Sequence, residues 1–208
     1  MIIPKKTTLG ISSLSIATIL VIASLASVGM QTDAAARNII FQEKFRESFA
    51  SASETIVEGS IETSVFTEAF KTTSGDTEIV LLISQFDTST DTFLLDFFGF
   101  GPADQLTVAN NLASATFSGT ITGFDFITGE EKTFTVDVDL TATGKAETIN
   151  VGQHFITPDF KAVTNLNAKI RPASGSLDVS GDGITFSTDE ASGQIGKVRA
   201  GQIIVERL

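Results

Sequence analysis

Apolar and polar residues alternate over most of the chain beyond about residue 55. The clearest example is the segment 132–143, where an apolar residue occupies nearly every second position and threonine or aspartate fills most of the others. A period of two places the two sets of side chains on opposite faces of a β-strand. The segment is therefore predicted to be a half-buried antiparallel strand with one face in water.

Several further segments carry strand signals. Residues 79–86 and 92–100 are apolar almost throughout, which is typical of central strands. Residues 115–122 alternate, and Gly123 then breaks the phase before Phe124, which predicts a β-bulge. Weaker strands are expected at 148–155, 162–170, 174–179, 183–186 and 202–206.

The segments between these strands are short and rich in turn residues. Short connections favour an antiparallel meander, and about ten strands cannot stay flat and open. We therefore expect an all-β fold in which the meander closes into a barrel, with a β-sandwich as the alternative.

Residues 38–50 follow a different period. Phe41, Phe45 and Phe49 recur every four residues, which would place them on one face of a helix, and Asn38 is suited to cap its start. The sequence predicts a short N-terminal helix here. It would either flank the β-domain or dock on a membrane surface or a partner.

The start of the chain predicts export. Lys5 and Lys6 precede a run without charge at 9–30, and small residues follow, as in a secretory signal. Cleavage is expected after Gly29 or before Arg37. The alternative is an uncleaved anchor, because the run is long enough to span a membrane.

These segments divide the chain into three parts. We expect a signal peptide or membrane anchor at 1–36, a short helix or linker at 37–54, and a single β-domain at 55–208. The domain would be secreted or held at the cell surface. Contact with the membrane is expected only through residues 9–30, if they are not cleaved.

Composition narrows the chemistry. The absence of cysteine excludes thiol catalysis and Cys-ligated metals, and it leaves core burial to stabilise the domain. A net charge of −11 with no basic stripe argues against nucleic acid as a partner and favours divalent cations. Seventeen phenylalanines without tryptophan or tyrosine disfavour sugar binding and an outer-membrane pore. They suit a dry core or an apolar ligand.

One loop has the spacing of a calcium site. Asp178, Ser180, Asp182 and Asp189 occupy positions 1, 3, 5 and 12 of an EF-hand-like loop, with Gly183 at position 6. Position 12 is aspartate rather than glutamate, and the flanking segments resemble strands. The alternative interpretation is a hairpin turn, which uses the same residue types.

Other polar groups give weaker indications. Asp87 and Asp91 bound a second oxygen-rich turn without a glycine, which predicts a β-turn and, as the alternative, a cation site. An enzyme would have to combine His154, the sole histidine, with Asp137 and Asp139 in one cleft. No nucleophile motif accompanies them, so no catalytic residue is assigned.

Two stretches, LASATFSGT at 112–120 and RPASGSL at 171–177, resemble a scattered set of exported β-rich microbial proteins without an assigned activity. The resemblance extends from about residue 79 to the end of the chain. It implies an exported all-β module and no functional residues.

The sequence therefore predicts an exported, non-enzymatic module that binds an extracellular or cell-surface partner or serves a structural role. One alternative is a barrel that carries an apolar small ligand in an internal cavity. The other is a hydrolase-type enzyme. No cofactor is expected, apart from the calcium ion considered above.

Overall fold

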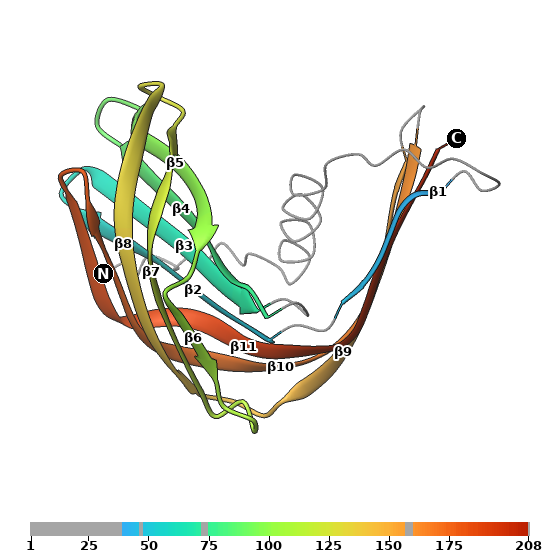
Figure 1. The fold of residues 1–208 in the computed structure, drawn as a ribbon. Helices are drawn as coiled ribbons and strands as arrows, with labels where there is room; N and C mark the ends of the chain where they lie inside the picture. Colours follow the sequence, from blue (N-terminus) through green and yellow to red (C-terminus); the bar gives the residue numbers. More distant parts are fainter. Residues whose placement is uncertain (1–38, 46–47, 72–74, 157–159, 208) are drawn as a thin grey trace, which may run out of the picture.

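The computed structural model describes residues 39–45, 48–71, 75–156 and 160–207, and every regular element in these ranges is a β-strand (Figure 1). The predicted all-β class is confirmed. The predicted signal or anchor at 1–36 lies outside the described residues. The strands are β1 (Ile39–Phe45), β2 (Ser48–Glu58), β3 (Ile61–Lys71), β4 (Thr77–Asp87), β5 (Thr92–Pro102), β6 (Gln105–Val108), β7 (Ser114–Asp125), β8 (Glu130–Ala142), β9 (Glu147–Ile156), β10 (Phe160–Gly181) and β11 (Ile184–Arg207).

Eight of these strands form a closed, hydrogen-bonded ring. Their order is β11-β2-β3-β4-β5-β7-β8-β10, and β10 pairs with β11 to complete the circle. Every pair in the ring is antiparallel, and most neighbours are consecutive in the chain, as expected for a meander. The short strand β6 lies off this path and pairs with β7.

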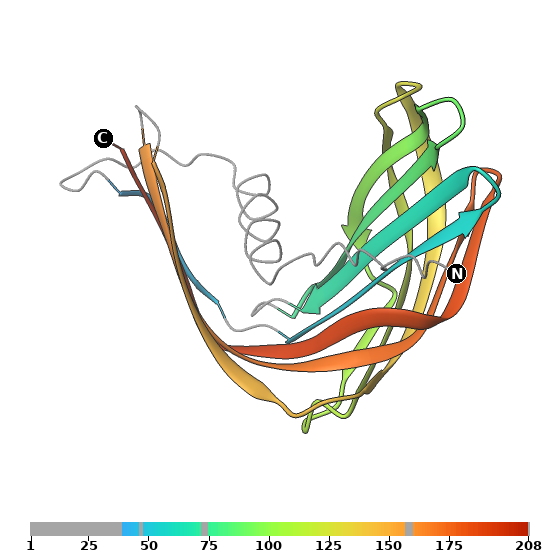
Figure 2. The ribbon, with the colours of Figure 1, turned by 180° about the vertical axis from the view of Figure 1, so that it is seen from behind.

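The two longest strands extend beyond the ring. β10 and β11 contain 22 and 24 residues, which corresponds to roughly 70–80 Å of strand. Outside the ring, β10 pairs with β9 and β11 pairs with β1. We call this four-stranded extension the arm; it comprises β1, β9, residues 160–172 of β10 and residues 197–207 of β11. The arm curves away from the ring in both views (Figures 1 and 2).

The predicted N-terminal helix is wrong. Ile39–Phe45 is strand β1, paired with β11, and Ser48–Glu58 is strand β2, which belongs to the ring. The four-residue spacing of phenylalanine suggested a helix, but an isolated helix of this length is marginal on its own. Pairing with a neighbouring strand outweighs that weak local preference. Among the described residues, β-structure therefore begins at Ile39 rather than at about residue 55.

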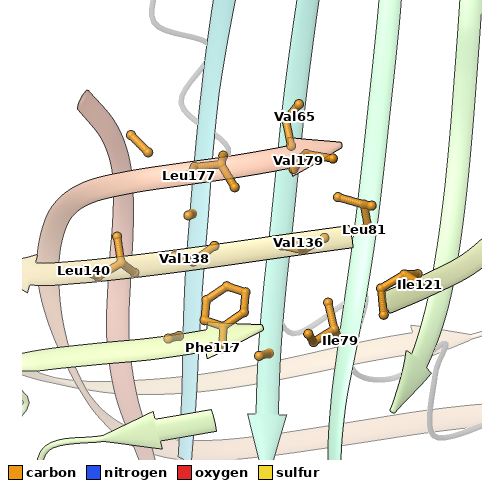
Figure 3. Close-up of a cluster of buried hydrophobic side chains, with 14 of the residues drawn as sticks. Val65, Ile79, Leu81, Phe117, Ile121, Val136, Val138, Leu140, Leu177 and Val179 are labelled. Atoms are coloured by element: carbon orange, nitrogen blue, oxygen red, sulfur yellow. The ribbon is translucent and has the colours of Figure 1, made fainter. Parts of the chain in front are cut away.

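The interior of the ring is a packed hydrophobic core (Figure 3). On β8, Phe134, Val136, Val138 and Leu140 are fully buried and alternate with exposed residues, as the sequence predicted. Phe97 of β5 packs edge-on against Phe134, with ring centroids 4.7 Å apart. Side chains from the surrounding strands fill the rest of the space, among them Ile79, Leu81, Phe117, Ile121, Leu177, Val179 and Ile195.

The predicted bulge at Gly123 is wrong, because the β7–β8 pairing continues through this residue without a register shift. Gly123 lies where β7 crosses β5, and a Cβ there would clash with the Phe98 carbonyl oxygen. Glycine is needed for this close approach of two backbones. Because the phase is kept, Phe124 points outward and the next residue, Asp125, is buried.

Candidate functional site

The segment predicted to bind calcium forms the β10–β11 hairpin. Asp182 and Gly183 are its two turn residues, with φ angles of 41° and 81°. Positive φ at both central positions is the signature of a type I′ turn, for which Asp-Gly is a favoured pair. The Asp182 carboxylate accepts a hydrogen bond from the backbone N–H of Thr133, and the Asp178 carboxylate accepts one from the Ser187 hydroxyl.

This hairpin spreads the predicted ligands along two strands. Asp178 and Ser180 lie two residues apart on β10, and same-face neighbours on a strand are separated by about 7 Å. Asp189 lies on β11, beyond Ser187, which is the residue paired with Asp178. Within the described residues, no group of three or more acidic or histidine side chains is arranged to hold a metal. Calcium binding at this loop stays a prediction.

The Asp87 turn is held by its own side chains. The Asp87 carboxylate accepts hydrogen bonds from the hydroxyl and the backbone N–H of Ser89, at 2.6 and 2.8 Å. These bonds lower the pKa of Asp87 to about 2. Thr88 joins this turn to the β2–β3 turn, since its backbone N–H donates to the Ser60 carbonyl at 2.8 Å. The geometry is that of a β-turn.

The structure does not bring the three residues of the enzyme hypothesis together. His154 is exposed on β9, where it pairs with Val163 of β10. Asp137 lies on β8 and pairs with Asp178 of β10. The two positions on β10 are separated by about 50 Å of strand. A cleft that combines His154 with Asp137 and Asp139 is therefore absent from the described residues.

Asp125 is a buried carboxylate that the sequence did not single out. Its oxygens accept hydrogen bonds from the Thr128 hydroxyl at 2.7 Å and the Ile127 N–H at 3.0 Å, and Lys132 Nζ lies 3.3 Å away. Burial acts to raise the pKa of Asp125, but these hydrogen bonds outweigh it and lower the pKa. The arrangement closes the β7–β8 hairpin, so the role of Asp125 is structural.

A row of apolar side chains crosses the outside of the ring. Phe66 of β3 pairs with Leu82 of β4, Leu82 with Phe98 of β5, and Phe98 with Phe124 of β7. Directly paired residues in antiparallel strands point to the same face of the sheet. Phe98 and Phe124 are 38% and 48% exposed, and Phe100 continues the apolar surface on β5. We call this outer surface the aromatic wall.

Two further features extend the aromatic wall. The ring of Phe126 lies 6.1 Å from that of Phe124, and Phe126 is 62% exposed. At the far end of β5, a register shift lets Phe93 pair with Phe86, and their ring centroids lie 5.0 Å apart. A large exposed apolar surface is uncommon on a soluble domain and marks a contact site.

Along β7, β8, β10 and β11 the outside of the ring is polar. The corresponding row is Ser118 of β7, Asp137 of β8, Asp178 of β10 and Ser187 of β11, each paired with the next. Thr116 and Asp139 form part of the neighbouring row. We call this surface the polar wall. Its exposed side chains face water.

The phenylalanines were expected in a core or a ligand pocket, and the aromatic wall was not predicted. Phe66, Phe98 and Phe124 come from strands far apart in the chain, and only the register of the ring places them in one row. The available signal was the run at 92–100, which is apolar almost throughout. Such a run cannot be buried on both faces if only one face of the strand meets the core.

A groove of about 460 Å³ lies at one end of the aromatic wall, lined by Glu78, Phe100, Pro102 and neighbouring residues. Burial and the charge of Asp76 raise the pKa of Glu78. A second groove, of about 560 Å³, lies on the arm, and its lining includes Asn150, Asn165, Asn167 and Gln202. Both volumes are large enough for a small molecule.

No protein family and no curated protein matches the chain. One solved structure is similar. It is the solid-state NMR structure of the outer membrane protein AlkL in DMPC lipid bilayers, at 15% sequence identity. The match covers 88% of this chain and 97% of that chain, with a TM-score of 0.21, which is too low to establish a shared fold. Among the described residues, no helix has the length and apolar character needed to cross a membrane.

Proposed function

We propose that the protein is an exported, non-enzymatic binding module that holds apolar ligands or partner surfaces against its aromatic wall. The observation that carries this proposal is the cross-strand row formed by Phe66, Leu82, Phe98 and Phe124 on the outside of the ring. Exposing these rings to water is unfavourable, because each buries a large apolar area when it is covered. A partner that covers them recovers that free energy.

The packed interior of the ring favours binding outside rather than inside. Phe97 and Phe117 in the ring interior are at most 1% exposed, so a ligand there would have to displace well-packed side chains. The alternative function, a carrier of an apolar small ligand in a barrel-like ring, is therefore best supported at the groove beside Phe100. In that version the ligand lies against the wall and not within a lumen.

The polar wall supports an aqueous setting for the rest of the ring. A ring embedded in lipid needs an apolar outer band, whereas Asp137, Asp139 and Asp178 project from this one. Together with the predicted export signal at 1–36, this supports a secreted or cell-surface location. The calcium ion predicted at Asp178, Ser180, Asp182 and Asp189 would be an accessory to such a module, not its function.

The test is a titration with Nile red, a neutral apolar dye whose fluorescence rises in apolar surroundings. Phe98→Ser combined with Phe124→Ser should weaken dye binding about tenfold, which corresponds to the apolar area removed. The matched control is Val57→Ser, which removes an apolar side chain that is 60% exposed but lies outside the row. Equal dye binding by all three proteins would overturn the proposal.

Native mass spectrometry of protein purified from its own secreting cells separates the alternatives. A retained organic mass that disappears in the double phenylalanine variant would favour the carrier. A calcium-sized increment that is lost on chelation and in Asp178→Asn would identify the hairpin as an ion site. A polypeptide without either would leave a macromolecular partner as the occupant of the aromatic wall.

A further inference from the structure

Charge is distributed very unevenly between the ring and the arm. Between Ser48 and Ala142 the chain carries fifteen carboxylates and two cations, Lys71 and Lys132. The four arm segments carry the opposite excess, with the cations Lys44, Lys161, Lys169, Arg171, Lys197, Arg199 and Arg207 against the acids Glu43, Glu147 and Glu206. The net charge of −11 is therefore the sum of a strongly acidic ring and a basic arm.

The arm gathers several of these cations on one face. Lys161, Lys169 and Arg171 are separated by even numbers of residues on β10, so they share a face, and alternate positions such as Ala162 and Ala168 are buried on the other. We call the first the basic face. Lys197 of β11 joins this face, because it pairs directly with Lys169.

The pairing of Lys169 with Lys197 is unfavourable in the isolated chain. Like charges that face each other across antiparallel strands destabilise the pair. Lys197 donates a hydrogen bond to the side-chain oxygen of Asn110, and Arg171 donates one to the carbonyl of Gly144, both neutral acceptors. Among the described residues, Lys169, Lys197 and Arg171 form no ion pair, in contrast to Lys132, which pairs with Asp125 in the ring.

The polar wall carries a like-charge pair of the opposite sign. Asp137 of β8 pairs directly with Asp178 of β10, so two carboxylates face each other there. Asp178 accepts a hydrogen bond from the Ser187 hydroxyl, and no ion pair of the described residues includes either aspartate. A cationic surface laid on this wall would relieve the repulsion between the two carboxylates.

The groove on the arm adds hydrogen-bonding capacity to the basic face. Asn165 and Asn167 share the face of Lys169, and they line this groove of about 560 Å³ together with Asn150 and Gln202. Asn167 Nδ2 donates to Asn150 Oδ1 at 2.6 Å, and the remaining amide hydrogens are available to acceptors. Carboxylates are strong acceptors for such groups.

We infer that copies of this protein associate head to tail, with the basic face of one arm against the polar wall of the next copy. The second copy is the occupant favoured by charge complementarity, because both surfaces belong to the same chain and each carries an unrelieved like-charge pair. The two surfaces are different patches, so the contact is heterologous and leaves one of each free at the ends. Such contacts build open chains or closed rings of copies.

The proposed contact and the net charge predict opposite effects of salt on association between copies. A chain of charge −11 should repel its copies most strongly at low salt, whereas the proposed contact should be strongest there. Analytical ultracentrifugation of the exported protein at about 20 mM and about 500 mM salt compares Debye lengths of roughly 20 Å and roughly 4 Å. We expect oligomers at low salt that dissociate at high salt.

Two charge-reversed variants make the test specific. Lys169→Glu with Lys197→Glu removes the basic face, and Asp137→Lys with Asp178→Lys removes the acidic pair. Each variant alone should remain monomeric at low salt. A mixture of the two should form oligomers again, because the intact arm meets the intact wall and the reversed arm meets the reversed wall. Lys71→Glu, an exposed charge reversal on the ring, is the control and should still form oligomers.

Three results would overturn the inference. They are a wild-type protein that stays monomeric at low salt, association that strengthens with salt, and a Lys169→Glu, Lys197→Glu variant that associates as well as wild type. If wild type is monomeric and the arm variant loses only binding to heparin, then the arm binds an anionic polymer instead. The double phenylalanine variant of the dye experiment should still form oligomers, so the failure of one proposal is distinguishable from failure of the other.

Discussion

The aromatic wall and the polar wall belong to the same ring and share the same inner face. Phe97 on β5 and Phe134 on β8 touch in the core, yet the outward neighbours of Phe97 are Asp96 and Phe98, whereas those of Phe134 are both threonine. The inner positions must be apolar, because they make the core. The outer positions are free of that requirement. The difference between the walls therefore shows which positions of this sheet are selected for contact rather than for folding.

The largest expected difference in stability is between substitutions at two adjacent residues of β5. Phe97→Ala should lower the free energy of unfolding by about 4 kcal/mol, because it leaves a cavity beside Phe134. Phe98→Ala should lower it by less than about 1 kcal/mol, because Phe98 is already exposed to water on the aromatic wall. Urea denaturation of both variants measures the difference. Equal losses would mean that the aromatic wall is part of the core.

The hairpin that joins the two walls depends on a buried charge. Asp125→Ala should lower the free energy of unfolding by about 3 kcal/mol, because it leaves Lys132 and the backbone N–H of Ile127 without their acceptor. The loss should exceed that of Asp139→Ala, which removes an exposed carboxylate from the polar wall. Thermal unfolding at neutral pH compares the two variants. A similar shift in unfolding temperature for both variants would contradict the structural role of Asp125.

The same carboxylate should make stability depend on pH. The folded-state pKa of Asp125 is lower than its unfolded value, so its contribution is present above the unfolded pKa of about 3.9 and is lost as the pH falls through the folded pKa. The gap in unfolding free energy between wild type and Asp125→Asn should therefore be widest near neutrality and narrow below about pH 4. A gap that is constant with pH would contradict this assignment.

A smaller loss of stability is expected at the β10–β11 turn, which lies at the tip of the polar wall. Gly183→Ala should lower the free energy of unfolding by about 1 kcal/mol, because φ at this turn residue is +81°. No atom lies within 4 Å of the added methyl group, so backbone strain is the expected cause. Gly129→Ala, at φ +74° in the β7–β8 turn, should match it. Addition of calcium should not offset either loss if the segment acts only as a hairpin.

The smallest effect concerns the acidic pair. Asp137→Asn should raise the free energy of unfolding by about 0.5 kcal/mol at low salt, because it removes a like charge opposite Asp178. The gain should shrink at high salt, where the repulsion is screened. Thr135→Ser, on the same wall without a charge, should show no salt-dependent gain. The comparison should be made at protein concentrations too low for association.

The sequence predicted much of the ring and little of the surfaces. Strand β8 and the inward positions Phe134, Val136, Val138 and Leu140 followed from strict alternation, which reports directly on a sheet with one buried face. The helix at 38–50 was wrong, since three phenylalanines at four-residue spacing are weak evidence against strand pairing with β11. The strands predicted at 162–170 and 174–179 are one strand, because alternation cannot detect that pairing continues through the intervening turn-like residues.

The candidate surfaces escaped prediction for a related reason. Lys169 and Lys197 are separated by 28 positions, so no basic stripe is visible in the chain, and only the register of β10 with β11 makes them neighbours. The same holds for Phe98 and Phe124. A sequence window reports on contacts within one strand, whereas the surface of a sheet is made across strands.

The amino-acid sequence by itself determined the all-β class, the inner face of the central strands and the Asp-Gly hairpin, because alternation and turn chemistry are local properties. The tertiary structure alone decided the closure of the ring, the extension of β10 and β11 into an arm, and the separation of aromatic, acidic and basic surfaces. Those features depend on register between distant strands. Register is set by the joint burial of many side chains in one core, which no single segment of the chain contains.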